Sequence, residues 1–240
     1  MTPQDYTADE MMTVAAARQL ADATTCFVGI GLPSTAAILA RATHAPGCVL
    51  IYESGTVAAK PDVLPLSIGD GELAETADAV ISVPEVFNYW LQAGRVDVGF
   101  LGAAQIDRAG NLNTTVIGPY DAPEVRLPGA GGAPEIASSA KRVVVVLRHS
   151  TRAFVERVGF VTSVGPPSIV MTDLGLLTPH PETRELVLSA VHPGVEAADV
   201  VRATGWHLQV ADDLGRTDPP TAAELTALRE LHRRTDDANR

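Results

Sequence analysis

The sequence is poor in lysine, cysteine and aromatic residues, and it has no long apolar run. Only two of its 18 basic residues are lysines, Lys60 and Lys141, and its 29 acidic residues give a net charge of −11. Because nucleic-acid binding needs clustered cations, this composition argues against a nucleic-acid partner. No apolar run approaches the roughly 18 residues that a membrane-spanning helix needs, so no membrane partner is predicted either.

The two cysteines and six histidines do not form any recognisable metal-binding or disulfide pattern. Cys26 and Cys48 lie in apolar, strand-like surroundings. We interpret them as small buried hydrophobic residues in a reducing, cytoplasmic environment. The histidines include no pair with metal-ligand spacing, so no metal site is predicted, and His192 before Pro-Gly is interpreted as a structural residue.

Apolar residues make up 46% of the 240 residues and charged residues 20%, which is ordinary for a globular chain. The absence of repeats and linkers favours a single domain over residues 1–240. Strand-like and helix-like segments alternate, which predicts an α/β fold with a mainly parallel sheet flanked by helices. The expected strands are CFVGIG (26–31), CVLIY (48–52), AVISV (79–83), VDVGFLGAAQI (96–106), RVVVVL (142–147), IVMTDLG (169–175), ELVLSAVHP (185–193) and HLQVAD (207–212).

Two capping-box patterns mark helix starts. Thr7 and Glu10 precede a helix expected over residues 11–23, and Thr221 and Glu224 open the last helix, which carries an apolar stripe. Further helices are expected over residues 34–44, 84–94 and 195–205.

The segment VLIYESGTVAAKP, residues 49–61, places a carboxylate at the end of an apolar strand. A carboxylate is costly to desolvate, so Glu53 needs an explanation. One is a dinucleotide site, because Gly29 and Gly31 follow a strand and an acidic residue often ends the next strand. Against it, Ser34 replaces the third glycine and Pro33 removes an amide donor.

A second explanation is covalent catalysis by Glu53. A carboxylate can attack an activated acyl group if it has a rigid mount and amide donors for the oxyanion. The Ser54-Gly55 turn would provide the mount, and the glycine-rich segment LPGAGGAPE, residues 127–135, would provide the donors. A third explanation is that Glu53 is a solvated strand-end charge and the glycines merely form a loop. The residues alone leave these explanations open.

The motifs VGIGLPS, YESG, LPLSIGDGELAETADAV, GFLGAAQIDRAGNLNTT, LPGAGGAPEIA and HPGV…ATGW follow one another along nearly the whole chain. Together they resemble the β subunits of class I coenzyme A transferases, most of all those of the 3-oxoadipate type with an E-S-G nucleophile motif. The resemblance implies the CoA-transferase, ribose-5-phosphate isomerase-like fold. It also implies Glu53 as nucleophile, the glycine-rich segment as oxyanion site and Asn113 near the reacting groups. The implied oxyanion residues are Gly131 and Gly132, and the implied substrate-binding residues are Gly29, Gly31, Ser54, Gly55, Asn113 and Gly129.

The resemblance implies a reaction as well. CoA would move from a donor, expected to be succinyl-CoA, to a short carboxylic acid, expected to be 3-oxoadipate, without any bound metal or redox cofactor. The alternatives are a glutaconate-type transferase subunit and an acyl-CoA hydrolase or ring-cleaving relative. An α subunit is the expected partner, in a heterodimer or α2β2 heterotetramer. The chain departs from the family in its short connection at Pro166-Pro167-Ser168, where the relatives carry a longer glycine-rich loop.

Overall fold

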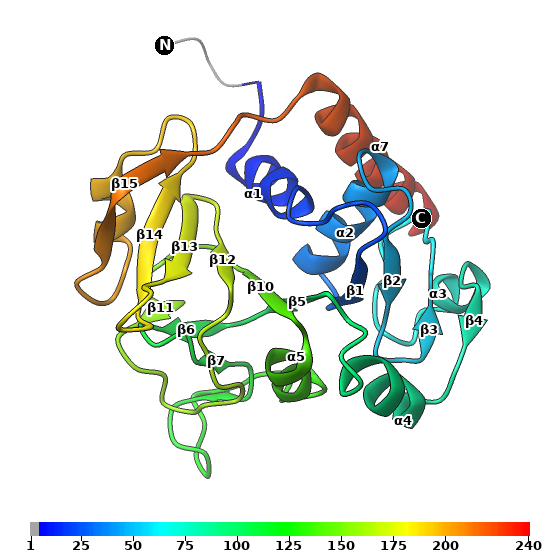
Figure 1. Ribbon diagram of the computed structural model, residues 1–240, viewed down its shortest axis with the longest axis horizontal. Coiled ribbons are helices and arrows are strands. Elements are labelled where there is room, and N and C mark those ends of the chain that lie inside the picture. The colour runs from blue at the N-terminus through cyan, green and yellow to red at the C-terminus, as the bar shows by residue number, and fades with distance from the viewer. Residues whose placement is uncertain (1–4) are drawn as a thin grey trace.

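The computed structural model describes residues 5–240 and contains a ten-stranded mixed sheet with helices on both faces (Figure 1). The parallel strands β12, β10, β5, β1 and β2 form its centre. Beyond them the pairing is antiparallel from β12 through β13 to β14 and from β2 through β3 to β4, and β15 pairs parallel with β14 at the outer edge. The predicted α/β fold with a mainly parallel sheet is therefore confirmed. The order across the sheet is β15 (Gln209–Arg216), β14 (Leu186–Val191), β13 (Gly175–Pro179), β12 (Ile169–Met171), β10 (Arg142–Val146), β5 (Val98–Gly102), β1 (Thr25–Val28), β2 (Val49–Ile51), β3 (Thr56–Val57) and β4 (Ala79–Val80).

The strand order reverses at β1. The chain passes from β1 to β2 on one side, and β5, which comes later in the sequence, lies on the other side. In open α/β sheets such a switch point leaves a crevice beyond the carboxyl ends of the strands, where ligands bind. Glu53, two residues beyond β2, stands at that edge.

Two segments expected as single strands are each divided in the structure. Residues 96–106 form β5 and then, after Ala103 and Ala104, β6 in a separate sheet, because the chain changes its hydrogen-bonding partners there. Residues 169–175 turn between β12 and β13, since the Thr172 hydroxyl accepts hydrogen bonds from the amides of Leu174 and Gly175. The small sheets join β11 (Phe154–Val155), β6 (Gln105–Asp107) and β7 (Leu112–Asn113), and β8 (Val116–Ile117) with β9 (Val125–Arg126).

Helices cover both faces of the large sheet. Both predicted capping boxes are present at Thr7 and Thr221, the N-caps of α1 and α7. One face packs against α1 (Ala8–Ala17), α2 (Leu32–Ala42) and α7 (Ala222–Ala238), with α3 (Gly71–Glu75) at its margin. The other face packs against α5 (Ala133–Ser139), α6 (Ala197–Arg202), and α4 (Val83–Glu85) with the π-helix η1 (Val86–Leu91) that continues it.

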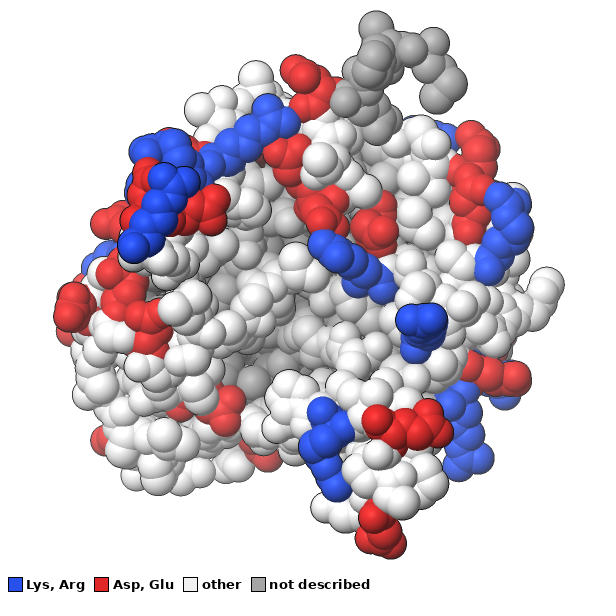
Figure 2. Space-filling model, turned by 180° about the vertical axis from the view of Figure 1, so that it is seen from behind, with Lys and Arg blue, Asp and Glu red and all other residues white. Residues whose placement is uncertain are grey.

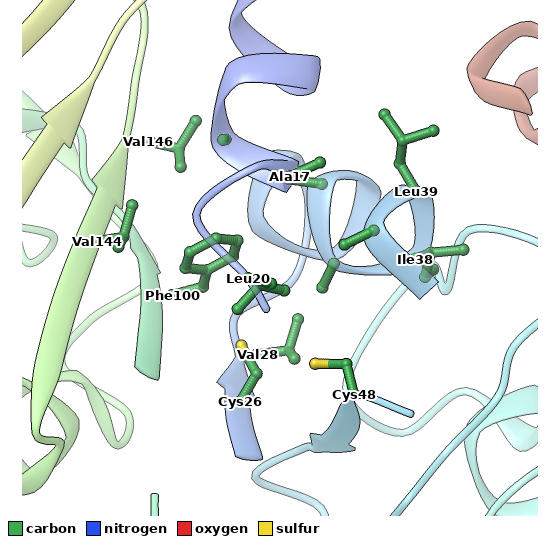
Figure 3. Close-up of a cluster of buried hydrophobic side chains, with 14 of the residues drawn as sticks. Ala17, Leu20, Cys26, Val28, Ile38, Leu39, Cys48, Phe100, Val144 and Val146 are labelled. Carbon is green, nitrogen blue, oxygen red and sulfur yellow. The ribbon is translucent and has the colours of Figure 1, made fainter. Parts of the chain in front are cut away.

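Alternation along the strands divides the apolar side chains between two cores. In β1, Cys26 and Val28 belong to the core beneath α1 and α2, whereas Phe27 belongs to the core on the opposite face. Figure 3 shows Cys26 and Cys48 among aliphatic side chains of the first core, and both are buried free thiols, as predicted. Within residues 5–240, no helix is long and apolar enough to cross a membrane.

Candidate active site

A cavity of about 490 Å³ opens at the switch point of the sheet. Its walls come from the carboxyl ends of β1 and β5, the turn after β2 and the glycine-rich segment that leads into α5. This is the position at which ligands of α/β sheets bind. The lining residues are Phe27, Val28, Gly29, Ile30, Glu53, Ile68, Leu101, Gly102, Ala103, Ala104, Thr114, Pro128, Gly129, Ala130, Gly131, Gly132, Ala133 and Ile136.

Glu53 is mounted on a tight turn between β2 and β3. The amide of Gly55 donates to the carbonyl of Tyr52 at 3.0 Å, and the amide of Tyr52 donates to the carbonyl of Thr56 at 3.1 Å. Gly55 has φ +104°, and a Cβ there would lie 2.0 Å from the carbonyl oxygen of Ile81. Only glycine fits at this position, so the E-S-G sequence fixes where Glu53 leaves the sheet.

The Glu53 carboxylate has no hydrogen bond or ion pair to any of residues 5–240. It is also the sole charged side chain among the described residues that line the cavity. The cavity wall is otherwise made of glycine, alanine, aliphatic and aromatic residues with one threonine hydroxyl. The carboxylate oxygens are therefore left available to a ligand in a largely apolar pocket.

The glycine-rich segment lies directly against that carboxylate. A Cβ at Gly131 would lie 3.5 Å from Oε2 of Glu53, and one at Gly132 would lie 3.3 Å from its carboxyl carbon. Within the described part of the chain, the amides of Gly131 and Gly132 donate no hydrogen bond. Gly132 is buried, and buried amides without a partner are rare, so these donors are available for an oxygen atom of a ligand.

Thr114 anchors the start of the glycine-rich segment. Its hydroxyl donates to the carbonyl of Gly129 and its carbonyl accepts from the amide of Gly129, both at 2.8 Å. The neighbouring Asn113 is fully buried, and its carboxamide bonds to Gln105, the amides of Thr115 and Val116, and the carbonyl of Val116. Asn113 therefore shapes the turn that presents Thr114, and Thr114, not Asn113, lines the cavity.

The remaining expected residues fall into two groups. Gly29 lines the cavity, but its amide donates to the carbonyl of Phe100 and is not free for a phosphate, which disfavours the dinucleotide explanation. Gly31, with φ +87°, is the N-cap of α2 and does not line the cavity. Ser54 and Gly55 form the turn behind Glu53 and are also absent from the cavity wall, and the Ser54 hydroxyl is buried without a hydrogen-bond partner.

Two residues that contribute to the site were missed from the sequence. Thr114 sits within an N-T-T run in which nothing distinguishes one hydroxyl from the other. Phe87 contacts the glycine-rich segment from behind, although its sequence neighbours indicate only a helix. Their importance follows from contacts between segments far apart in the sequence, which local patterns do not encode.

The chain is similar to known proteins over most of its length. The sequence profile of the family described as Coenzyme A transferase matches residues 9–203. The chain is 55% identical to the β subunit of the 3-oxoadipate CoA-transferase of Pseudomonas knackmussii, over 96% of this chain and 95% of that protein. The crystal structure of glutaconate coenzyme A-transferase from Acidaminococcus fermentans superposes with a TM-score of 0.88, at 30% identity over 95% of each chain. The decarboxylase AibA/AibB superposes with a TM-score of 0.87, at 31% identity over 98% of each chain.

Proposed function

Since the chain belongs to the coenzyme A transferase family, we propose that it transfers CoA through a covalent intermediate on Glu53. It is the β subunit of a CoA-transferase. The donor in this proposal is succinyl-CoA and the acceptor is 3-oxoadipate. The observation that carries the mechanism is the Glu53 carboxylate beside two glycines: within residues 5–240, neither the carboxylate nor the two glycine amides have a hydrogen-bond partner.

The reaction begins when a carboxylate oxygen of Glu53 attacks the thioester carbonyl of the donor. The C–S bond breaks and yields a mixed acyl-glutamyl anhydride and CoA thiolate. The thiolate attacks the glutamyl carbonyl, which releases the donor acid and leaves Glu53 as a CoA thioester. The acceptor acid then repeats these two steps in reverse. The departing CoA remains beside the anhydride, so its return attack is effectively intramolecular, with effective molarities that reach roughly 10⁵ M or more.

Negative charge develops on the carbonyl oxygen in each of these steps. The amides of Gly131 and Gly132 are the donors proposed to stabilise it, since they adjoin the carboxyl group and lack internal acceptors. Because glycine carries no side chain, both the substrate and the Glu53 carboxylate can approach this backbone closely. The apolar wall formed by residues such as Leu101 and Ile136 limits the access of water, which would hydrolyse the anhydride.

The proposal includes an α subunit that covers the cavity. Two groups of exposed apolar residues, called the apolar rims, are the proposed contact surface: the first is Leu66, Ile68, Val80, Val83 and Tyr89, and the second is Tyr120, Val125, Val161 and Val164. The first rim includes the lining residue Ile68, and the second lies next to Pro128 along the chain. Contiguous exposed apolar side chains of this kind mark protein interfaces.

CoA also needs cations that this chain does not offer at the cavity. Both lysines are already paired, Lys60 with Asp78 and Lys141 with Asp97. On the face shown in Figure 2, basic side chains are interspersed with acidic ones. The α subunit is therefore the proposed source of the groups that bind the phosphates of CoA.

Trapping the intermediate tests this function. We expect the complex with its α subunit, incubated with succinyl-CoA, to carry CoA on Glu53 alone, detected by hydroxylamine cleavage and peptide mass spectrometry. Glu53→Gln should abolish the adduct and the transfer, and Glu53→Asp should lower kcat by roughly a hundredfold, because the carboxylate is withdrawn by about 1 Å. Glu75→Gln on the exposed face of α3 is the matched control. Full turnover by Glu53→Gln would refute the mechanism.

The acceptor is tested separately. We expect 3-oxoadipate to give a higher kcat/KM than glutaconate when both are supplied with succinyl-CoA. A preference for glutaconate would reassign the acceptor but keep the mechanism. Equal CoA release with and without an acceptor acid would instead identify a thioester hydrolase.

A further inference from the structure

Gly132 occupies a narrow gap between an aromatic ring and the Glu53 carboxyl group. A Cβ at this position would lie 2.5 Å from Cζ and 2.9 Å from Cε1 of Phe87, and 3.3 Å from the carboxyl carbon of Glu53. The first two distances are shorter than any tolerated carbon–carbon contact. A side chain at position 132 would therefore meet both the Phe87 ring and the Glu53 carboxyl group, so only glycine leaves room for the backbone beside them.

Phe87 is itself held firmly from behind. Its ring packs against Phe27 with 5.7 Å between centroids and an angle of 54° between the ring planes. Phe27 is fully buried in the central strand β1 and lines the same cavity. Tilted aromatic pairs at this separation are attractive beyond simple burial. The Phe87 ring, which lies next to Gly132, thus packs against Phe27 of the central strand β1.

The local helix geometry determines where Phe87 points. Phe87 belongs to η1, in which the amide of Gln92 donates to the carbonyl of Phe87 at 2.8 Å, five residues earlier. Because the hydrogen bonds of a π-helix join residues five apart, Val86 and Leu91, which are also five residues apart, can both be buried in the core. Single turns of π-helix are rare and occur frequently at functional sites.

We infer that Phe87 is a positioning residue that sets the separation between the Glu53 carboxylate and the Gly131–Gly132 amides. The inference rests on the proposed function of Glu53. Phe87 touches no reacting atom and acts through Gly132. If the ring edge is removed, the glycine-rich segment gains room to retreat from the carboxylate, and the proposed donors move away from the oxyanion.

The main test is a double-mutant cycle between Phe87 and Gly132 in the complex with the α subunit. The rate of CoA-adduct formation on Glu53 from succinyl-CoA is measured in a single turnover. We expect Phe87→Leu to lower this rate by roughly tenfold to a hundredfold with little change in KM for succinyl-CoA, since a misplacement of about 1 Å has effects of this size. Gly132→Ala should lower it by about a hundredfold, because its Cβ meets the ring and displaces the donors.

The double variant distinguishes positioning from general destabilisation. Leucine lacks the Cε1 and Cζ atoms that would meet the new Cβ, so Gly132→Ala combined with Phe87→Leu should be at least about tenfold faster than Gly132→Ala alone. Phe87→Tyr, which adds an oxygen at the ring atom nearest to Gly132, should be slower than wild type. Phe154→Leu is the control, because it makes the same substitution at a buried ring that stacks on His149 and Trp206, whereas Phe87 is half-buried.

The outcomes separate this inference from the proposed function. If wild type forms its adduct, two results would overturn the positioning role. The first is a double variant whose loss of rate equals the product of the two single losses. The second is a Phe87→Leu variant with a lowered Tm and an unchanged single-turnover rate. Absence of the adduct in wild type would overturn both. Rescue in the double variant, with Phe154→Leu lowering Tm but not the rate, would support the inference.

Discussion

At the scale of single residues, His149 shows what burial without a charged partner does to a titratable group. Its ring stacks on Phe154 with 3.7 Å between centroids, and its nitrogens meet only the hydroxyls of Thr172 and Thr204. Burial lowers the pKa of His149 to about 4. Burial also lowers the pKa of His192, which lies in the same region and bonds to Thr217 and the carbonyl of Thr172.

This burial predicts a loss of stability in mild acid. The unfolded chain takes up a proton on His149 near pH 6.5 but the folded chain only near pH 4, so the unfolded state binds more protons between these values. Between pH 7 and pH 5, His149 should contribute a destabilisation of about 2 kcal/mol. Urea unfolding at pH 7 and at pH 5 measures this difference in the free energy of unfolding. His149→Phe should reduce the difference.

The position of Glu53 at the candidate site could be predicted because a charged residue directly after an apolar strand is unusual, whereas its proposed role came from the resemblance carried by the E-S-G motif. Gly55 was expected to bind substrate, but it forms the turn behind Glu53, and its requirement for glycine comes from Ile81, which lies in another segment. Thr114 and Phe87 could not be predicted. Hydroxyl and aromatic residues are common throughout the sequence, and only the fold reveals which ones contact the glycine-rich segment.

At the scale of elements, the turn between β2 and β3 and the glycine-rich segment hold the two halves of the site. The turn is closed by its own hydrogen bonds and by the carbonyl of Gly55, which accepts from the amide of Ile81 at 2.9 Å. The glycine-rich segment is held by Thr114 at its start and continues into α5. Each holds its proposed catalytic group through contacts with a second segment, so small changes in either should affect activity.

Replacing Gly55 tests the first of these elements. Gly55→Ala should lower the free energy of unfolding by at least about 2 kcal/mol, because the residue has φ +104° and its Cβ would overlap the carbonyl of Ile81. Denaturant titration measures the loss. Gly159→Ala is the control, since a Cβ at Gly159 meets no atom within 4 Å. Equal stability of the two variants would contradict the constraint at Gly55.

Replacing Thr114 tests the second element. Thr114→Val keeps the shape of the side chain but removes the hydroxyl that donates to Gly129. We expect kcat to fall by roughly tenfold, because one hydrogen bond is worth about 1 kcal/mol and the segment loses its anchor. Thr114→Ser keeps the donor and should remain close to wild type. If both variants had the same kcat, the anchor would not matter for catalysis.

Most elements were predictable because apolar alternation and caps are local signals. The divided segments at 96–106 and 169–175 were not, because an unbroken apolar run does not reveal where the chain changes its partner strand. The helix expected over residues 84–94 is present, but it starts as the three-residue α4 and continues as the six-residue π-helix η1, which ends at Leu91. That detail depends on the burial of Val86 and Leu91 against the sheet.

At the scale of the whole molecule, the net charge of −11 and the open cavity point to a chain that works in an assembly. The two apolar rims leave large side chains such as Leu66 and Val164 more than two-thirds exposed, at 73% and 76%. In the chain alone, these apolar side chains and the proposed nucleophile Glu53 remain open to water. An α subunit that covers the cavity would bury the apolar rims and also keep water away from Glu53.

The isolated chain should therefore bind and transfer CoA poorly. We expect the purified chain to show no succinyl-CoA transfer above background, and addition of the α subunit to restore transfer at an equimolar ratio. Tyr89→Glu in the first rim should weaken reconstitution, because it places a charge in the proposed interface. Arg240→Glu, in the exposed chain end after α7, should not. Robust transfer by the isolated chain would contradict this expectation.

The two outer strands of the large sheet determine how other chains can approach it. β4 has only two residues, and Pro84 follows shortly after it, so its edge offers a short row of backbone groups. At the opposite end, the pairing of β15 contains a register shift, and the strand carries the adjacent charges Asp212 and Asp213. Both margins thus discourage another strand from extending the sheet. A partner must therefore recognise this protein through side chains, and edge-to-edge aggregation is disfavoured even while the apolar rims are uncovered.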